Sequence, residues 1–206
     1  MKSLFDRYYK KYDSWYDKNK FAYLSELKAI KNILPKKAKI LEIGVGTGRF
    51  AAPLKIGYGV DPSKKMLRFA RKRGIKTKLG FGEKLPFGSS FFDCVVIIIT
   101  ICFVNDPALV LREARRVLNK NGKIIIGIID KESFLGDFYK RKKSVFYRQA
   151  HFFSVKEISG LLRDAGFKRL SYSQTLFSMP EDIISIEKPL RGFGKGGFVI
   201  VRGRAK

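Results

Sequence analysis

The sequence predicts an α/β fold in which a mostly parallel sheet carries helices on both faces. Three observations support this class. Short apolar runs rich in β-branched residues, such as residues 95–99 and 124–129, have the length of buried strands. Segments with apolar residues at helical spacing alternate with these runs, and turn residues separate the two kinds of segment. Such alternation is typical of parallel strands joined by helices.

The size and composition of the chain are those of one domain. Its 206 residues suit a single α/β domain, so we expect one domain over residues 1–206. Apolar residues make up 45% of the chain, which supplies a core and excludes a disordered protein. No apolar run approaches the roughly 20 residues of a membrane span, and the amino terminus is too polar for a signal peptide. We therefore expect no membrane span and a cytoplasmic location.

Residues 1–34 are predicted to form an aromatic helical cap, which precedes a core over residues 36–206. Aromatic residues recur in the cap at spacings of three and four, which places many of them on one helix face. They are Phe5, Tyr8, Tyr9, Tyr12, Trp15, Tyr16, Phe21 and Tyr23. Pro35 and the lysines after it end this region.

The first half of the core is predicted to hold three strands and two helices. The strand over residues 39–43 leads into a glycine-rich turn and then into a helix. A short second strand ends at residues 59–61, and a helix follows over residues 63–72. A third strand is expected near residues 77–81.

The second half of the core is predicted to hold four strands and two helices. The strands are expected over residues 94–99, 123–129, 168–175 and 197–202. Asp106 caps a helix that starts at Pro107 and ends at Asn121 and Gly122. A capping-box pattern at residues 154–157 opens the other helix.

The strongest functional signal is the glycine-rich turn after the first strand, Glu42-x-Gly44-x-Gly46-x-Gly48. Glycines are needed where the backbone turns sharply and a ligand approaches closely. Arg49 occupies the place of the third glycine of a dinucleotide fingerprint, and no Gly-Lys-Ser/Thr of a phosphate loop is present. The carboxylate of Glu42 would repel a pyrophosphate and favour a positively charged group, such as the ammonium of methionine.

A second acidic residue, Asp61, follows Gly44 by 17 positions, at the end of the second strand. A carboxylate at this place can accept hydrogen bonds from both ribose hydroxyls of an adenosine ligand. The alternative is an aspartate that only stabilises the turn before Pro62. Together, Glu42, the glycines and Asp61 favour a ligand that contains both adenosine and an ammonium group.

Along nearly its whole length the chain resembles the class I S-adenosylmethionine-dependent methyltransferases, particularly the type 11 group related to quinone-biosynthesis methyltransferases. The segments that carry the resemblance are residues 42–48, 59–63, 82–87, 90–95, 113–118 and 153–167. It implies a Rossmann-like sheet of seven strands with the last strand antiparallel, and S-adenosylmethionine as cofactor. The cofactor-binding residues that it implies are Glu42, Gly44, Gly46, Gly48, Asp61, Pro62, Met66, Gly82, Glu83 and Thr100.

One departure from the family and two motifs of other methyltransferases that are absent bear on the chemistry. Phe81 stands where the family often has an acidic residue for the adenine amino group, so adenine binding is expected to be apolar or to use backbone groups. The Asn/Asp-Pro-Pro-aromatic motif of enzymes that methylate base amines is absent at residues 100–103, and Cys102 lacks a preceding proline. Both observations count against methylation of base amines and against covalent attack on cytosine.

No catalytic residue and no metal site is predicted. Methyl transfer is a direct displacement at an activated sulfonium, so the protein mainly orients the reactants. His151 is the single histidine, and a structural or solvated role is favoured over catalysis. The two cysteines, Cys94 and Cys102, are expected to be small buried side chains. One histidine and two cysteines do not suffice for a zinc cluster.

The identity of the methyl acceptor is left open by the sequence. A net charge of +25 keeps RNA, such as tRNA, as an alternative to the leading interpretation, a small-molecule acceptor. A non-catalytic nucleotide-binding module is a third interpretation. Residues 132–150, which mix basic and aromatic side chains, and residues 178–196 are expected to be insertions on the substrate side. The oligomeric state is not predicted.

Overall fold

The computed structural model describes residues 4–142 and 144–205 and contains one eight-stranded sheet. Its strands are β1 (Ile40–Ile43), β2 (Tyr58–Asp61), β3 (Lys76–Leu79), β4 (Phe92–Ile98), β5 (Leu118–Ile129), β6 (Phe167–Thr175), β7 (Leu190–Arg191) and β8 (Phe198–Ala205). They lie in the order β3-β2-β1-β4-β5-β8-β6-β7. The first five strands pair in parallel, and β8 runs antiparallel to both of its neighbours.

This topology confirms the α/β class and the antiparallel last strand. The structure adds an eighth strand to the seven expected, because two residues of the segment 178–196 pair with β6 as β7. A strand of two residues is too short to show the alternation by which strands are found in a sequence.

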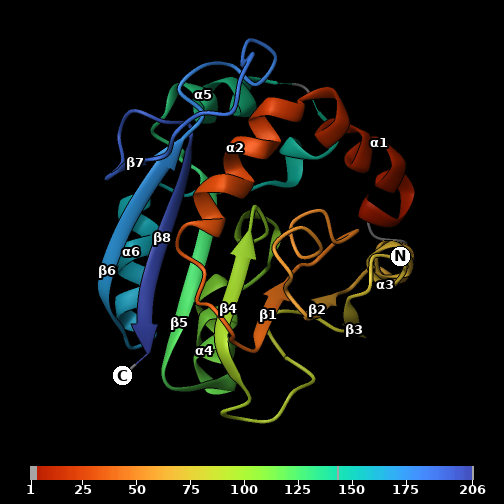
Figure 1. Cartoon of the computed structure of the whole chain (residues 1–206), viewed down its shortest axis with the longest axis vertical. Coiled ribbons are helices and arrows are strands. Elements are labelled where there is room, and N and C mark those ends of the chain that lie inside the picture. Colours follow the sequence, from red (N-terminus) through yellow and green to blue (C-terminus); the bar gives the residue numbers. More distant parts are fainter. Residues whose placement is uncertain (1–3, 143, 206) are drawn as a thin grey trace.

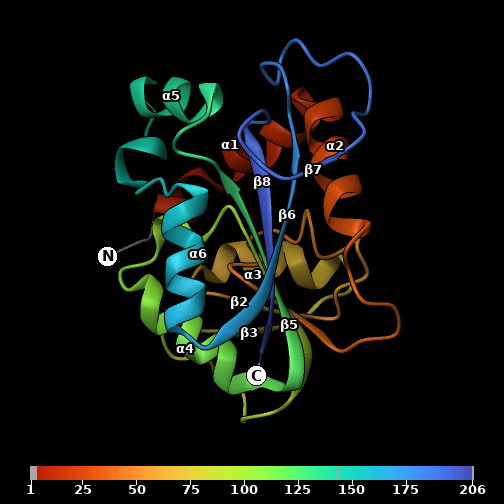
Figure 2. The same cartoon turned by 90° about the vertical axis from the view of Figure 1, so that its left-hand side faces the viewer.

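Helices cover both faces of the sheet. They are α1 (Leu4–Lys18), α2 (Lys20–Lys31), α3 (Lys64–Lys72), α4 (Pro107–Val117), α5 (Phe134–Arg141) and α6 (Val155–Asp164), with short 3-10 helices η1 (Ile101–Phe103) and η2 (Tyr147–Gln149). One buried core lies between the sheet and α2 and α3, and a second lies between the sheet and α4 and α6. Figure 2 shows α4 and α6 on the same side of the sheet. The central strand β4 is apolar nearly throughout because it contributes to both cores.

The amino-terminal helices do not extend the sheet but cover one end of it. Figure 1 shows α1, α2 and α5 over the end at which β1 and β4 finish. In open α/β sheets, ligands bind at the carboxyl ends of the strands. The predicted helical cap is therefore present, apart from residues 1–3, which lie outside the described residues, and it roofs the edge where a ligand would bind.

Two local predictions were wrong. No helix follows the glycine-rich turn, since residues 49–55 form turns that are interrupted by Pro53. The helix α4 ends at Val117 rather than at Asn121 and Gly122, because Leu118 is already extended and pairs with β4. The segment 132–150, which was expected to be an insertion on the substrate side, contains α5, whose first turn is capped by Ser133.

Among the described residues, no helix is both long and apolar enough to cross a membrane.

Candidate functional site

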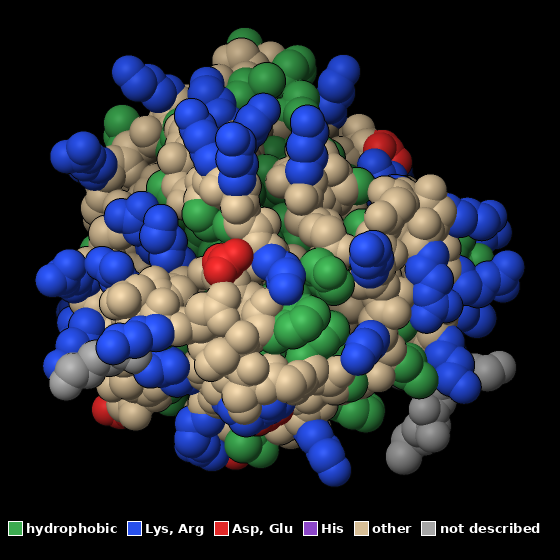
Figure 3. Space-filling view, turned by 60° about the horizontal axis from the view of Figure 1, so that its bottom comes forward, with side chains coloured by type: hydrophobic (Ala, Val, Ile, Leu, Met, Phe, Trp, Pro, Cys, Tyr) green, Lys and Arg blue, Asp and Glu red, His purple; other side chains and the backbone are tan. Residues whose placement is uncertain are grey.

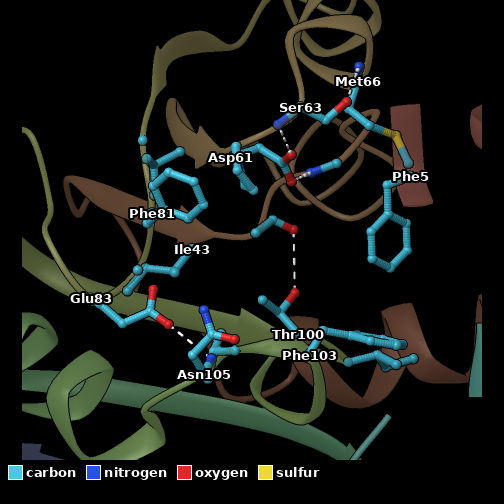
Figure 4. A pocket seen from close by; sticks show the side chains of 18 of the residues that line it. Phe5, Ile43, Asp61, Ser63, Met66, Phe81, Glu83, Thr100, Phe103 and Asn105 are labelled. Atoms are coloured by element: carbon cyan, nitrogen blue, oxygen red, sulfur yellow. Dashed lines mark hydrogen bonds between the residues drawn. The ribbon is translucent and has the colours of Figure 1, made fainter. Parts of the chain in front are cut away.

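A cavity of about 420 Å³ lies at the carboxyl ends of β1, β2 and β4, and we call it the strand-end cavity. Side chains from the glycine-rich turn, from the ends of these strands and from α1 surround it (Figure 4). Eight of the ten predicted cofactor residues line it, namely Gly44, Gly46, Asp61, Pro62, Met66, Gly82, Glu83 and Thr100. The other two, Glu42 and Gly48, are not in its lining. The structure thus gathers residues from three separate motifs, together with Met66 and Thr100, around one space.

The glycine-rich turn leaves no room for side chains on its first residue. Gly44 has a φ of +72°, and a Cβ there would lie 2.2 Å from Cγ2 of Thr100. Gly46 also has a positive φ, but a Cβ there would meet nothing closer than Tyr12 at 3.9 Å. Gly48 differs from both, because a Cβ there would lie 2.5 Å from Cδ1 of Ile75 in the core. Gly44 and Gly46 therefore shape the cavity wall, whereas Gly48 serves the packing behind it.

Asp61 is held rigidly at the end of β2. One carboxylate oxygen accepts the backbone N–H of Gly46 at 2.9 Å, and the other accepts that of Ser63 at 2.8 Å. Burial raises the pKa of Asp61 to about 6, against the lowering effect of these two hydrogen bonds. Each carboxylate oxygen keeps a second lone pair, so the side chain can still accept hydrogen bonds from a ligand.

Glu42 lies buried beneath the same turn, with 2% of its surface exposed. Burial and the charge of Asp61 raise its pKa well above the usual range, and a backbone hydrogen bond from Ala51 only partly opposes them. Its Oε2 atom has no hydrogen-bond partner among the described residues. A buried carboxyl with an unpartnered oxygen is costly unless a donor or cation reaches it.

The opposite rim of the strand-end cavity is apolar. Phe81 is 61% exposed, and Figure 4 shows it across the cavity from Phe5 of α1. Glu83 lines the cavity, but its Oε1 accepts the backbone N–H of Asn105 at 3.0 Å and so fastens the loop before α4. Its carboxylate therefore stabilises this loop as well as lining the cavity.

Thr100 follows β4 at the boundary of the cavity. Its hydroxyl donates to the carbonyl of Ile98 at 3.0 Å and approaches that of Gly44 at 3.4 Å. The preceding residue, Ile99, has a φ of +47°, which is unusual for a β-branched side chain. Such strain at a cavity edge persists only where the surrounding structure enforces it. The strand end is thereby fixed against the glycine-rich turn.

An ionic latch fastens α1 over the strand-end cavity. Asp13 accepts hydrogen bonds from Thr47, Arg49 and Arg73, and Asp17 binds the same guanidinium of Arg49 at 2.7 Å. Burial raises the pKa of Asp13, but these donors outweigh it and hold the pKa below its usual range. Arg49, which stands at the third glycine position of a dinucleotide fingerprint, thus links the glycine-rich turn to helix α1 of the cap.

A second cavity of about 320 Å³ adjoins the first, and we call it the aromatic chamber. Four residues line both cavities and form the boundary between them, namely Phe5, Tyr12, Ile99 and Phe103. Further rings come from α1 and from the segment 132–150, and Tyr139 and Tyr147 stack at 4.4 Å. The segment 178–196 contributes no residue to either lining. It is instead joined to α2, since the N–H of Glu187 donates to Ser25.

The histidine and the two cysteines considered in the sequence analysis have structural roles. His151 lines neither cavity; its backbone N–H donates to Cys102, and its ring packs on Phe153. Burial raises the pKa of the Cys94 and Cys102 thiols to about 12, so both are neutral. Within residues 4–142 and 144–205, no group of three His, Cys, Asp or Glu is placed to hold a metal ion.

Sequence reasoning missed a buried acid, Glu26, which lines the aromatic chamber. It stands four residues after Ala22 and four before Ile30, on the face of α2 that packs inward. An acidic residue on the apolar face of a helix was the signal that would have found it. Phe103 and Asn105, which line the strand-end cavity, carried no comparable signal.

The comparisons with known proteins agree with this geometry. Residues 41–126 match the family model described as a methyltransferase domain. A solved S-adenosylmethionine-dependent methyltransferase of Thermotoga maritima, described as a possible histamine N-methyltransferase, is 49% identical with a TM-score of 0.96, over 98% of each chain.

Two curated relatives extend the comparison. An uncharacterized protein of Methanocaldococcus jannaschii is 46% identical over 97% of each chain. The demethylmenaquinone methyltransferase of Thermotoga maritima is 30% identical, over 73% of this chain and 68% of its own.

These relatives are similar along the chain and not only in the glycine-rich turn, so they set aside the non-catalytic interpretation. The similarity also accounts for the sheet order and for the cavity at the strand ends. The chain belongs to the class I S-adenosylmethionine-dependent methyltransferases of the type 11 group, and its cofactor is S-adenosylmethionine.

Proposed function

We propose that this enzyme transfers the methyl group of S-adenosylmethionine to a small molecule held in the aromatic chamber. The observation that carries the proposal is the shared boundary of the two cavities, formed by Phe5, Tyr12, Ile99 and Phe103. A cofactor in the strand-end cavity and an acceptor in the chamber would meet at that boundary. Methyl transfer requires this kind of approach, with the two reacting atoms in line.

The residues of the strand-end cavity fit the cofactor. Asp61, in the lining, suits the ribose hydroxyls. The unpartnered Oε2 of Glu42, which lies buried beneath the glycine-rich turn and not in the lining, suits the ammonium of the methionine part. Phe81 supplies an apolar surface for adenine in place of the acidic residue common in the family. Gly44 and Gly46 give close access to the backbone, and Thr100 borders the boundary with the chamber.

The bound cofactor supplies a methyl group that is already activated by the sulfonium charge. The chain's own contribution is to position the acceptor, to exclude water and to fix the strand end. The latch of Asp13 and Arg49 closes α1 over the site, and the strained Ile99 holds Thr100 in place. Orientation of this kind can supply roughly 7–11 kcal/mol of a reaction barrier. We assign no catalytic base.

The size and lining of the aromatic chamber favour a small acceptor. At about 320 Å³ it lies within the range of small-molecule sites, and half of its lining residues are aromatic. RNA is the alternative, because the chain carries a net charge of +25. Figure 3 shows lysine and arginine side chains spread over the whole visible face, rather than gathered into one stripe. The expected cytoplasmic location rests on the polar amino terminus and stays a prediction.

Calorimetric titration tests the cofactor site. S-adenosylmethionine and S-adenosylhomocysteine should bind wild type, NAD should not, and Asp61→Ala should weaken binding of both sulfur compounds. Asp164→Ala, at an exposed carboxylate at the end of α6, is the matched control. Equal binding by Asp61→Ala and wild type would remove the ribose assignment.

An acceptor screen tests the substrate class. Histamine and a demethylmenaquinol belong in it, because the relatives' descriptions name these chemistries. Transfer of a labelled methyl group to a small molecule supports the proposal. Methylation of tRNA, accompanied by tRNA binding that weakens steeply with salt, would replace it with the RNA alternative.

A further inference from the structure

Glu26 is a buried acid with no partner among the described residues. It lies in the middle of α2, fully buried, and lines the aromatic chamber but not the strand-end cavity. Neither oxygen of its carboxylate has a hydrogen-bond partner within that part of the chain. Buried polar groups are nearly always hydrogen-bonded, so a side chain with two unpartnered oxygens needs an explanation.

No cation of the chain supplies the missing partner within residues 4–142 and 144–205. Burial alone raises the pKa of Glu26 to about 8, and no lysine or arginine opposes it. Lys11 and Lys142 also line the chamber, but both are exposed, and Nζ of Lys142 lies over the ring of Phe138 at 4.8 Å. Nothing within the described residues therefore satisfies the two oxygens of Glu26.

The surroundings of Glu26 favour a cation. Its charge acts on tyrosines of α1, α2, α5 and η2, which are Tyr12, Tyr16, Tyr23, Tyr139 and Tyr147. Burial raises the pKa of each of these phenols, so none carries a negative charge at neutral pH. Aromatic faces attract ammonium groups, and the attraction grows where water is excluded.

We propose that the methyl acceptor carries an amine, and that Glu26 binds this amine in the aromatic chamber as its counter-ion. An ammonium has three N–H donors and satisfies both carboxylate oxygens, whereas a neutral hydroxyl has one donor and satisfies only one of them. Glu26 is thus a specificity-determining residue. This inference rests on the proposed function, since it takes the chamber to be the acceptor site.

Proton release follows from this pairing. Before binding at neutral pH, Glu26 holds a proton in most molecules, and a free alkylamine holds one as well. In the complex, the carboxyl and the amine together hold one proton fewer than they held apart. Binding should therefore release close to one proton, whether the remaining proton stays on the carboxyl or on the amine. Of the other titratable groups that line the chamber, the tyrosines and Cys102 stay neutral because their pKa values are raised, and Lys11 and Lys142 are exposed.

The test uses the full chain saturated with S-adenosylhomocysteine, so that no reaction occurs. 2-Phenylethylamine and its neutral analogue 2-phenylethanol are titrated calorimetrically, in two buffers of different ionisation enthalpy. We expect the amine to bind wild type roughly tenfold more tightly than the alcohol, as a charge-assisted hydrogen bond would give. The amine should also release about one proton.

Glu26→Gln keeps the shape of the side chain and removes the charge. We expect it to lose both the amine preference and the proton release, while Asp164→Asn, at an exposed carboxylate of α6, keeps both. Retained binding of S-adenosylhomocysteine shows that the variant is folded.

Two results would overturn the inference. One is that no amine binds the saturated protein, or that amine and alcohol bind wild type equally. The other is that Glu26→Gln keeps the amine preference. Tighter binding of 2-phenylethanol than of 2-phenylethylamine would likewise overturn it and assign the chamber to an uncharged acceptor. Failure of S-adenosylhomocysteine to bind wild type is a separate result, which counts against the proposed function itself.

Discussion

Replacement of Gly44 by alanine should lower the free energy of unfolding for two reasons, backbone strain and overpacking, and control variants can separate the two. The residue has a φ of +72°, and a left-handed conformation costs a non-glycine residue about 1–2 kcal/mol. The new Cβ would also lie 2.2 Å from Cγ2 and 2.3 Å from Oγ1 of Thr100. Overpacking of this kind costs about 1–3 kcal/mol. Gly44→Ala should therefore lower the free energy of unfolding by about 2–5 kcal/mol.

Two other glycines serve as matched controls. Gly74 has a φ of +85°, but a Cβ there would have nothing within 4 Å, so Gly74→Ala should cost only the backbone part of about 1–2 kcal/mol. Gly57 has neither a positive φ nor a neighbour within 4 Å of such a Cβ. Gly57→Ala should leave stability within about 0.5 kcal/mol of wild type, or raise it slightly.

Urea denaturation of the three variants without cofactor measures these differences, provided that the slope with denaturant is unchanged. A second replacement, Thr100→Gly, should recover the overpacking part of the loss in Gly44→Ala but none of the backbone part. A coupling of about 1 kcal/mol or more is expected between the two sites. If Gly44→Ala costs no more than Gly74→Ala, the contact with Thr100 does not constrain the turn, and the argument fails.

Three further predictions address charge. Affinity for S-adenosylmethionine should fall as the pH drops through about 6, because the ribose hydroxyls need ionised Asp61, and calorimetry that shows no change from about pH 5 to 8 would contradict this. A folded-state pKa of Glu26 raised from 4.5 to about 8 means that wild type loses stability as the pH rises across that window, by up to about 1.4 kcal/mol per unit. Glu26→Gln should therefore flatten the pH dependence of its denaturation midpoint, and an unchanged slope would show that the acid is not buried in solution. Arg49→Met should break the ion pairs with Asp13 and Asp17 and so loosen α1. Limited proteolysis within α1 should then become faster, while the distant helix α6 stays protected. Equal cleavage of variant and wild type would refute the latch.

Local patterns were sufficient to predict most of the fold. A few neighbouring residues suffice to predict each of three elements, namely the apolar strand β4, the helix α4 with proline at its first position, and the helix α6 with its capping box. Sequence patterns did not predict α5, because it is only eight residues long and the side that it buries depends on its contacts with the aromatic chamber. The helix expected after Gly48 was lost because Pro53 removes a backbone donor where a helix would need it.

The candidate site divides in the same way. The turn and Asp61 were predictable, because one ligand and one bend in the chain impose fixed spacings on them. Of the aromatic chamber, the sequence indicated only two aromatic segments, the helical cap over residues 1–34 and the insertion over residues 132–150. That Glu26 of α2, Tyr12 of α1 and Tyr147 of η2 share one space depends on how distant segments pack, which no spacing in the sequence records.

The helix α1 roofs both compartments, since Phe5 and Tyr12 belong to the walls of each. If the cofactor and the acceptor bind in these two compartments as proposed, the ion pairs of Arg49 with Asp13 and Asp17 hold one helix over both of them. Such an enzyme is expected to show a kinetic order: both substrates enter before the helix settles, and both products wait for the same opening. We then expect the opening of α1, rather than the displacement at sulfur, to limit the turnover rate.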